Sequence, residues 1–199
     1  MHRWFQKWVK NGALKKAMNK IISYAEQEGL IKLAKSFIDG TFLRSKNGSD
    51  NVGKTKVGKG HKLMAIVDEN GIPVSVNVTS ANPHESQLVE DTLQKISTQQ
   101  LPEKIIGDRA YDSDHLDDLM NEYNIQMIAP HKSNRVNKTQ DGRKLRSYKQ
   151  RWRVEDFYAK IQRFRKILIR YERHFDNFEG FVHAATMMVI AKMIGLLEG

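Results

Sequence analysis

The chain has 199 residues, with 33 lysines and arginines against 23 aspartates and glutamates, a formal net charge of +10 and no cysteine. The lack of cysteine excludes a disulfide-stabilised scaffold and a thiolate metal site. The positive charge favours a polyanionic partner such as nucleic acid, but it does not identify one. The longest apolar run, residues 187–191, falls well short of the ~20 residues of a membrane span, so we expect a cytoplasmic protein with no membrane partner.

The N-terminal part of the chain is predicted to form two helices followed by three strands. Residues 1–22 carry apolar side chains at helical intervals, and a second short helix is expected at 25–35. The period then changes, which indicates strands at 37–43, 61–68 and 73–79. A basic, glycine-rich loop separates the first two strands, and an Asn-Gly pair between the second and third predicts a hairpin.

The rest of the chain alternates between helices and short strands. The expected order is a helix at 88–96, a strand at 104–107, a helix at 113–123, a strand at 125–129, a basic loop at 131–147, a long helix from 148 to about 171, and a last helix at 178–197. Such an order predicts an α/β domain with a mixed sheet.

Residues 48–55 match the P-loop pattern of phosphate-binding proteins, Gly-x-x-x-x-Gly-Lys-Thr. A P-loop requires a helix that begins at the Lys-Thr pair, so that its amide groups point at the phosphate. Here two further glycines follow within a few residues and disfavour a helix. We therefore interpret the segment as a cationic loop that contacts a phosphate backbone through Lys54, Lys56 and Lys59.

Three carboxylates occupy positions that suggest chemistry. Asp39 lies inside an apolar strand, where an unpaired charge is costly, and Asp108 ends the strand at 104–107. Glu155 lies on the predicted long helix, where a lone glutamate usually faces water. Acids at the ends of neighbouring strands can converge, and three carboxylates supply the hard oxygen ligands that two Mg²⁺ ions need. The histidines have no zinc-like spacing.

The predicted long helix carries a polar stripe. At about 100° per residue, Arg151, Glu155, Gln162 and Lys166 project from one side of the helix. Another side is apolar, with Val154, Phe157, Ile161, Phe164 and Leu168. Periodicity leaves open whether the polar stripe faces solvent or the edge of the sheet.

Three segments of the chain occur in a specific order. They are Ile38-Asp39-Gly40-Thr41, then Gly107-Asp108-Arg109-Ala110-Tyr111-Asp112-Ser113, then Tyr148-x-x-Arg151-x-x-x-Glu155 with basic residues after it. Together they resemble the DDE transposases of bacterial insertion sequences, and they look most like the IS-five-like group of the IS-four/IS-five superfamily. The resemblance extends from about residue 35 to the C-terminus.

The resemblance implies an RNase H-like fold, in which helices flank a mixed sheet and a long C-terminal helix carries a catalytic residue. Asp39, Asp108 and Glu155 would bind two Mg²⁺ ions, for which Mn²⁺ can substitute. Tyr148 and Arg151 would position the phosphate, since arginine suits bidentate phosphate contact. The implied reaction is metal-dependent cleavage and strand transfer of DNA by a transposase enzyme.

The same resemblance implies an organisation and a set of partners. Residues 36–199 would be the catalytic domain, and residues 1–35 a helical remnant of a longer N-terminal region. The partners would be transposon ends and target DNA, bound by a homo-oligomer in the bacterial nucleoid, with an upstream reading-frame product of the same element as a further partner.

Further DNA contacts are expected from polar and basic residues near these segments. They are Lys132, Arg135, Gln162, Arg163 and Lys166. The family has a lysine seven positions after its glutamate, and this chain has Gln162 there. We therefore expect Lys166 or Arg163 to supply the missing cation.

Two other functions fit the same sequence. A truncated or catalytically inactive transposase product could bind DNA without cutting it, because residues 1–20 resemble the end of the family's N-terminal region and no helix-turn-helix precedes the catalytic segments. A general RNase H-like nuclease would cleave DNA without joining it to a target.

Overall fold

The computed structural model of the chain describes residues 2–46, 49–56, 58–133, 135 and 144–197. The helices are α1 (His2–Lys10), α2 (Ala13–Gln27), α3 (Val89–Leu93), α4 (Asp114–Glu122), α5 (Trp152–Ile161), α6 (Arg165–Leu168) and α7 (Phe175–Met193), with 3₁₀ turns η1 (Glu85–Leu88), η2 (Arg109–Tyr111) and η3 (Lys144–Gln150). The strands are β1 (Ser36–Ser45), β2 (Gly53–Thr55), β3 (Gly58–Val67), β4 (Pro73–Ser80), β5 (Lys104–Ile106), β6 (Gln126–Ile128) and β7 (Ile169–Arg170). Within these residues, no helix combines the length and the apolar character needed to cross a membrane.

The strands form one mixed, seven-stranded sheet with β1 and β3 at its centre. Strand β1 pairs antiparallel with β3 from Phe37 to Arg44. On its other edge, β1 pairs in parallel with β5 only at Ser36 and Phe37, and with β7 only at Arg44 and Ser45. Residues 38–43 of β1 thus have a strand partner on one edge only, among the strands that the structure describes.

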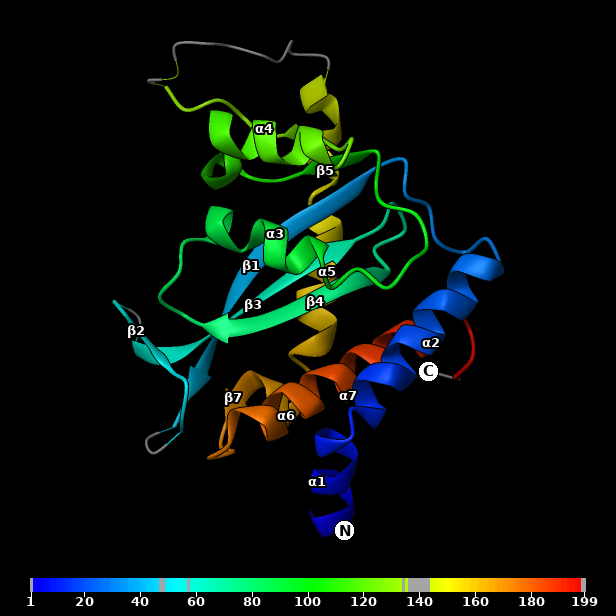
Figure 1. The fold of residues 1–199 in the computed structure, drawn as a ribbon, viewed down its shortest axis with the longest axis vertical. Helices are drawn as coiled ribbons and strands as arrows, with labels where there is room; N and C mark the ends of the chain where they lie inside the picture. Colours follow the sequence, from blue (N-terminus) through cyan, green and yellow to red (C-terminus); the bar gives the residue numbers. More distant parts are fainter. Residues whose placement is uncertain (1, 47–48, 57, 134, 136–143, 198–199) are drawn as a thin grey trace.

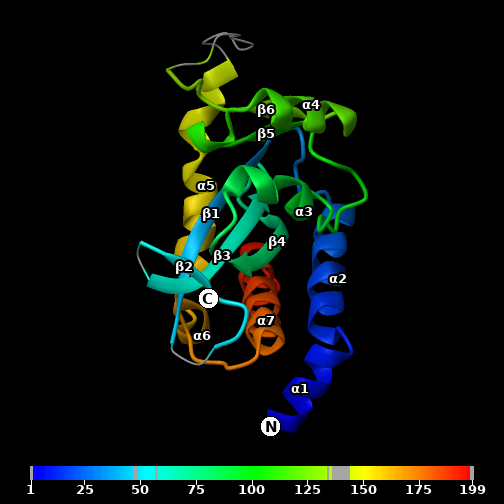
Figure 2. The ribbon, with the colours of Figure 1, turned by 60° about the vertical axis from the view of Figure 1, so that its left-hand side comes forward.

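Helices cover both faces of this sheet (Figures 1 and 2). On one face, α5 packs on β1 and β3, α7 packs on β4, and α2 lies along α7 (Figure 1). On the other face, α3 packs on β3 and β4, and α4 packs on β6. Side chains alternate along a strand, so Phe37 and Leu43 of β1 join the core under α5 and α7 while Ile38 joins the core under α3. The same alternation places Asp39 on the α5 face.

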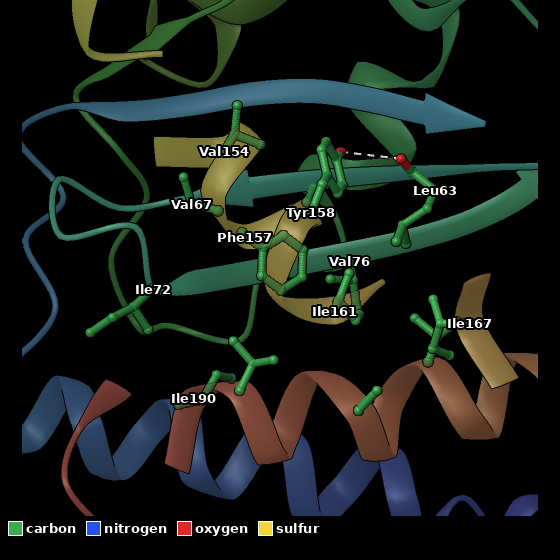
Figure 3. Close-up of a cluster of buried hydrophobic side chains, with 14 of the residues drawn as sticks. Leu63, Val67, Ile72, Val76, Val154, Phe157, Tyr158, Ile161, Ile167 and Ile190 are labelled. Carbon is green, nitrogen blue, oxygen red and sulfur yellow. Dashed lines mark hydrogen bonds between the residues drawn. The ribbon is translucent and has the colours of Figure 1, made fainter. Parts of the chain in front are cut away.

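The core under α5 explains why this helix is fixed on the sheet (Figure 3). Its buried residues Val154, Phe157, Tyr158 and Ile161 recur at intervals of three and four and face the sheet. Burying side chains of this size contributes about 1.5–3 kcal/mol each. Packing therefore determines both the position and the rotation of α5, and with them the direction of its polar residues.

The predicted fold class is confirmed, because a mixed sheet is flanked by helices in the expected order. The hairpin at Asn70-Gly71 is also confirmed: β3 and β4 pair antiparallel, and Gly71 has a φ of 82°. The helix expected at 25–35 is wrong, since α2 ends at Gln27 and Gly29 adopts a left-handed φ of 68°. The single helix expected at 1–22 is interrupted at Gly12, whose φ is 69°.

The long helix expected from residue 148 to 171 is also wrong. The segment divides into part of η3, the ten-residue helix α5, the short helix α6 and the strand β7. The physical reason lies at its end, where Arg170 is fully buried and its guanidinium donates hydrogen bonds to Asp50 and to the carbonyls of Glu172 and Arg173. These bonds, and the pairing of β7 with β1, outweigh the helical periodicity.

The cationic loop predicted between the first two strands is partly a strand. Lys54 and Thr55, where a P-loop would need a helix to begin, lie on strand β2, which pairs with the start of β3, so the rejection of the P-loop is confirmed. Lys54 and Lys59 lie directly opposite each other in this pair. Residues 47, 48, 57, 134 and 136–143, which belong to the two predicted basic loops, lie outside the described residues.

Two histidines, His61 and His183, are buried among the described residues. His61 Nδ1 lies 3.2 Å from the Thr79 carbonyl oxygen, and its Nε2 contacts the Arg170 guanidinium. Burial lowers the pKa of His61 to about 4, and the charge of Arg170 acts in the same direction. Burial likewise lowers the pKa of His183 on α7 to about 4, with Lys15 and Lys95 adding to the effect. Both side chains are thus neutral in the folded protein at neutral pH.

We expect the free energy of unfolding to decrease as the pH falls from about 6.5 to about 4. Over this range the unfolded chain protonates these histidines and the folded protein does not, whereas above it both states are neutral. Urea unfolding of the wild type and of His183→Gln at pH 7.5 and 5 should show a smaller pH dependence for the variant. The exposed His115→Gln variant is the control and should keep the wild-type change in the free energy of unfolding between the two pH values. The same change in all three proteins would contradict the effect assigned to His183.

Candidate active site

Asp39 lies within β1, at the level of Asp108, which follows the end of the neighbouring parallel strand β5. In this parallel pair Phe37 lies opposite Ile106. Asp39 comes two residues after Phe37, and Asp108 comes two residues after Ile106. The side chains are close enough that the charge of Asp108 contributes to raising the pKa of Asp39. The structure therefore brings together the first two acids predicted from the sequence, at the edge of β1 that lacks a strand partner.

Asp39 is held by groups on both sides of its carboxylate. The Arg151 guanidinium donates to Oδ2 over 2.8 Å, and the Gly40 amide donates to Oδ1 over 2.9 Å. Burial raises the pKa of Asp39 above its ordinary value, although Arg151 and the Gly40 amide oppose the rise. Asp39 is therefore a desolvated acid whose main counter-ion is one arginine.

Tyr148 extends this arrangement away from the sheet. The Arg151 guanidinium donates to the Tyr148 hydroxyl over 3.2 Å and lies 5.4 Å from the centre of its ring. The same guanidinium thus contacts both Asp39 and Tyr148. The structure places the predicted pair Tyr148 and Arg151 beside the predicted metal ligand.

The contacts of α5 show where its polar stripe points. Arg151 reaches Asp39, the Tyr158 hydroxyl lies 2.5 Å from the Asp39 carbonyl oxygen, and the Gln162 amide donates to the Thr41 hydroxyl over 3.3 Å. These three residues follow one side of the helix, so that side runs along β1. Glu155 lies between them in the sequence and on the same side, with an exposed side chain that makes no hydrogen bond or ion pair to another described residue.

The stripe is shorter than predicted, because Lys166 lies on α6 and not on α5. Its ammonium group pairs with Glu172 at 2.6 Å. Gln162 therefore stands at the end of the α5 stripe, and its amide is bonded to the strand that carries Asp39.

Asp108 begins a tight turn after β5. Its Oδ1 accepts a hydrogen bond from the Ala110 amide over 2.7 Å, which caps η2. Gly107 is required here, because a Cβ atom at this position would lie 2.6 Å from the Tyr111 ring. The Gly-Asp-x-x-Tyr sequence thus folds Tyr111 back under the aspartate.

Glu85 lies near the site, although the sequence analysis did not select it. The Tyr111 hydroxyl donates to its Oε2 over 3.2 Å, and Lys62 Nζ lies 3.8 Å from its Oε1. Burial raises the pKa of Glu85, and the charges of Asp39 and Asp108 raise it further. No sequence pattern marks this residue, since it lies in an irregular polar segment after β4.

The predicted DNA-binding residues are dispersed. Lys54, Lys56, Lys59, Lys132 and Arg163 are exposed. Arg135 instead contacts the carboxylates of three aspartates at the start of α4, namely Asp112, Asp114 and Asp117. In this arrangement Arg135 holds its loop against α4, so its predicted contact with DNA would require it to leave these partners.

The donor atoms fit a hard divalent cation that is shared with a substrate. Within the described residues, no group of three or more His, Cys, Asp or Glu side chains is arranged to hold a metal ion. Mg²⁺, however, is commonly bound by one or two carboxylates together with substrate phosphates and water. Asp39 and Asp108 provide such a pair.

A mixed sheet with Asp39 within β1, Asp108 after the neighbouring parallel strand β5 and α5 packed on β1 has the arrangement of an RNase H-like domain. The family model of the transposase DDE domain matches residues 33–190. The chain therefore belongs to the DDE transposase family and is a transposase of the insertion-sequence type.

Two relatives agree with this family, and a solved structure shares the fold. A protein from Brucella ovis assigned as the transposase of insertion sequence element IS6501 is 33% identical over 132 residues, which cover 64% of this chain and 95% of that protein. One from Burkholderia cepacia, assigned to element IS402, is 27% identical over 73% of this chain and 69% of that protein. The piggyBac transposase in its synaptic complex with hairpin DNA has the same fold, with a TM-score of 0.52 and 10% identity over 83% of this chain. The match spans 48% of that chain, about half its length.

We expect Tyr158→Phe to lower the free energy of unfolding by about 1–2 kcal/mol, because it removes the buried hydroxyl that donates a hydrogen bond to the Asp39 carbonyl oxygen. The hydroxyl lies 2.5 Å from the Asp39 carbonyl oxygen. It lies 3.1 Å from the carbonyl oxygen of Leu63, the contact drawn in Figure 3. Urea unfolding measures the change, and the exposed Tyr24→Phe is the matched control. A Tyr158→Phe protein as stable as the control would show that this hydrogen bond does not hold α5 on β1.

Proposed function

We propose that this transposase cleaves DNA at the ends of an insertion sequence and joins the freed 3′ ends to target DNA. The observation that carries the proposal is that Asp39 and Asp108 lie close together beside residues 38–43 of β1, with Arg151 bound to Asp39. The proposal includes the finer assignments: the IS-five-like group, a catalytic domain at 36–199, and a helical segment at 1–35 from a longer N-terminal region.

Asp39, Asp108 and Glu155 are the residues that would hold divalent metal, with Mg²⁺ as the expected ion and Mn²⁺ as its substitute. Bound there, the metal would activate the attacking water or 3′-hydroxyl and stabilise the departing oxygen. Glu155 makes no hydrogen bond or ion pair to another described residue that metal binding would have to break. It lies on the side of α5 that faces β1. Its role is therefore to complete the site when substrate is present.

Arg151 has two uses in this proposal. Without substrate it neutralises Asp39, at 2.8 Å. Its planar guanidinium is also suited to donate two hydrogen bonds to a phosphate. Because Tyr148 already contacts this guanidinium, a phosphate bound by Arg151 would lie beside both residues and next to the acids.

The β2–β3 pair supplies a candidate DNA surface away from the acids. Lys54 and Lys59 face each other across the pair, and like charges directly opposite each other destabilise a sheet. A phosphate backbone would remove that repulsion. Lys56, Lys132, Arg163, Gln162 and Lys166 remain proposed contacts on the remaining surface, as does Arg135 if it leaves its aspartates. We further propose a homo-oligomer on DNA in the bacterial nucleoid, with an upstream-frame product as an additional partner.

A DNA-binding product without catalytic activity is the second candidate. It is favoured by the lack of a three-carboxylate group among the described residues. The two functions differ in a cleavage assay with a plasmid that carries the gene and its flanking DNA: cleavage at the element ends with Mg²⁺ supports the transposase, whereas binding alone supports the second candidate. Cleavage without joining to a target would identify a nuclease.

The isosteric variants Asp39→Asn, Asp108→Asn and Glu155→Gln should each reduce Mg²⁺-dependent cleavage by about 100-fold or more, since a bound metal contributes several kcal/mol to catalysis. DNA binding should be retained, because losing an anion does not weaken attraction to phosphate. Rate and gel-shift measurements test this, with the exposed Asp118→Asn on α4 as control. A variant that cleaves at the wild-type rate identifies a residue that is wrongly assigned.

Replacing Lys54 or Lys59 by alanine should weaken DNA binding and lower the salt dependence of the binding constant by about one unit on a log–log plot. The matched control is Lys16→Ala, which removes the same charge from α2, on the opposite side of the molecule (Figures 1 and 2). Fluorescence anisotropy over a range of salt concentrations measures the slope. Identical slopes for the three variants would exclude the β2–β3 pair as a contact surface.

A further inference from the structure

Glu85 approaches the active site from the face of the sheet opposite to α5. It follows β4 and begins η1, and its partner Tyr111 belongs to the core under α3. Asp39 and its partner Arg151 lie on the α5 face. The two faces meet where β1 has no parallel strand beside it, and the charges of both aspartates act on Glu85 there.

Gly40 is what allows this approach. A Cβ atom at residue 40 would lie 2.8 Å from Cδ and 2.9 Å from Oε1 of Glu85. A larger residue at position 40 would therefore displace the Glu85 carboxylate, which lies in the space directly beside the backbone of Gly40. The Asp-Gly pair in β1 thus places two carboxylates beside one backbone position.

The contacts of Glu85 leave one of its oxygens available. Oε2 accepts the hydrogen bond from Tyr111, which fixes the side chain. Lys62 Nζ forms an ion pair with Oε1 at 3.8 Å and donates a hydrogen bond to the Pro83 carbonyl oxygen over 2.8 Å. Within the described part of the chain, Oε1 therefore has a nearby charge but no hydrogen-bond donor.

We propose that Glu85 is a fourth carboxylate of the active site and supplies an oxygen to the divalent cation of Asp39 and Asp108, directly or through one water molecule. The inference rests on the proposed function, since it concerns the same cation. Three acids near one point repel one another, and a divalent cation removes that repulsion. Tyr111 is then a positioning residue, which holds Glu85 through its hydroxyl, and Lys62 limits the negative charge while the cation is absent.

The test measures Mn²⁺ binding to the full chain without DNA, from the electron paramagnetic resonance signal of free Mn²⁺. Glu85→Gln keeps the size of the side chain and an acceptor for Tyr111, but removes the charge. We expect its Mn²⁺ affinity to fall about 10-fold, as for groups around a metal site, with an unchanged melting temperature. The matched control is Glu90→Gln, because Glu90 accepts a hydrogen bond from the Tyr123 hydroxyl at 3.1 Å in the same way.

The outcomes separate this inference from the proposed function. Weaker binding in Asp39→Asn and Asp108→Asn, with wild-type binding in Glu85→Gln, overturns the role of Glu85 alone. Wild-type binding in all three variants overturns the cation site and with it the proposed function. If Glu85→Gln does not fold, the wild type labelled with ¹³C-glutamate decides: substoichiometric Mn²⁺ must broaden the Glu85 carboxyl signal and not that of Glu90, and an unaffected Glu85 signal overturns the proposal.

Discussion

A carboxylate in the middle of an apolar strand is stable only if other groups replace the water that it has lost. Asp39 is such a carboxylate, and the groups around it come from several elements: the amide of Gly40 in its own strand and the guanidinium of Arg151 beside α5. Tyr158 adds a hydrogen bond to its backbone carbonyl. The helix that buries the core thus also stabilises the acid, so packing and active-site geometry depend on the same contacts.

The positive charge of the chain has two separate uses in this structure. Arg170 is buried and Arg135 is surrounded by aspartates, so both cations stabilise connections between segments. Lys54 and Lys59 are exposed and face each other across a strand pair, where they cost stability. A net charge of +10 therefore overstates the number of cations that are available to a polyanion.

The sequence was sufficient to predict the order of elements, the hairpin at Asn70-Gly71 and the juxtaposition of Asp39 and Asp108, because these depend on local periodicity and on strand ends. It was insufficient for the division of the predicted long helix, which depends on long-range bonds from Arg170 to Asp50.

Glu85 was missed for a similar reason. Its carboxylate lies in the space beside Gly40, a residue 45 positions earlier in the chain, and no local pattern contains that relation. The direction of the α5 stripe was ambiguous from periodicity, and its contacts with Asp39 and Thr41 resolve it.

The pairing of β1 has a consequence for how this chain can evolve. The strand is bound in parallel at both ends, to β5 at Ser36 and Phe37 and to β7 at Arg44 and Ser45, while β3 holds it along the other edge. A one-residue shift would turn every side chain of the strand to the opposite face and carry Asp39 away from Arg151. We therefore expect exchanges between apolar residues within β1 to be tolerated better than the gain or loss of one residue in the strand.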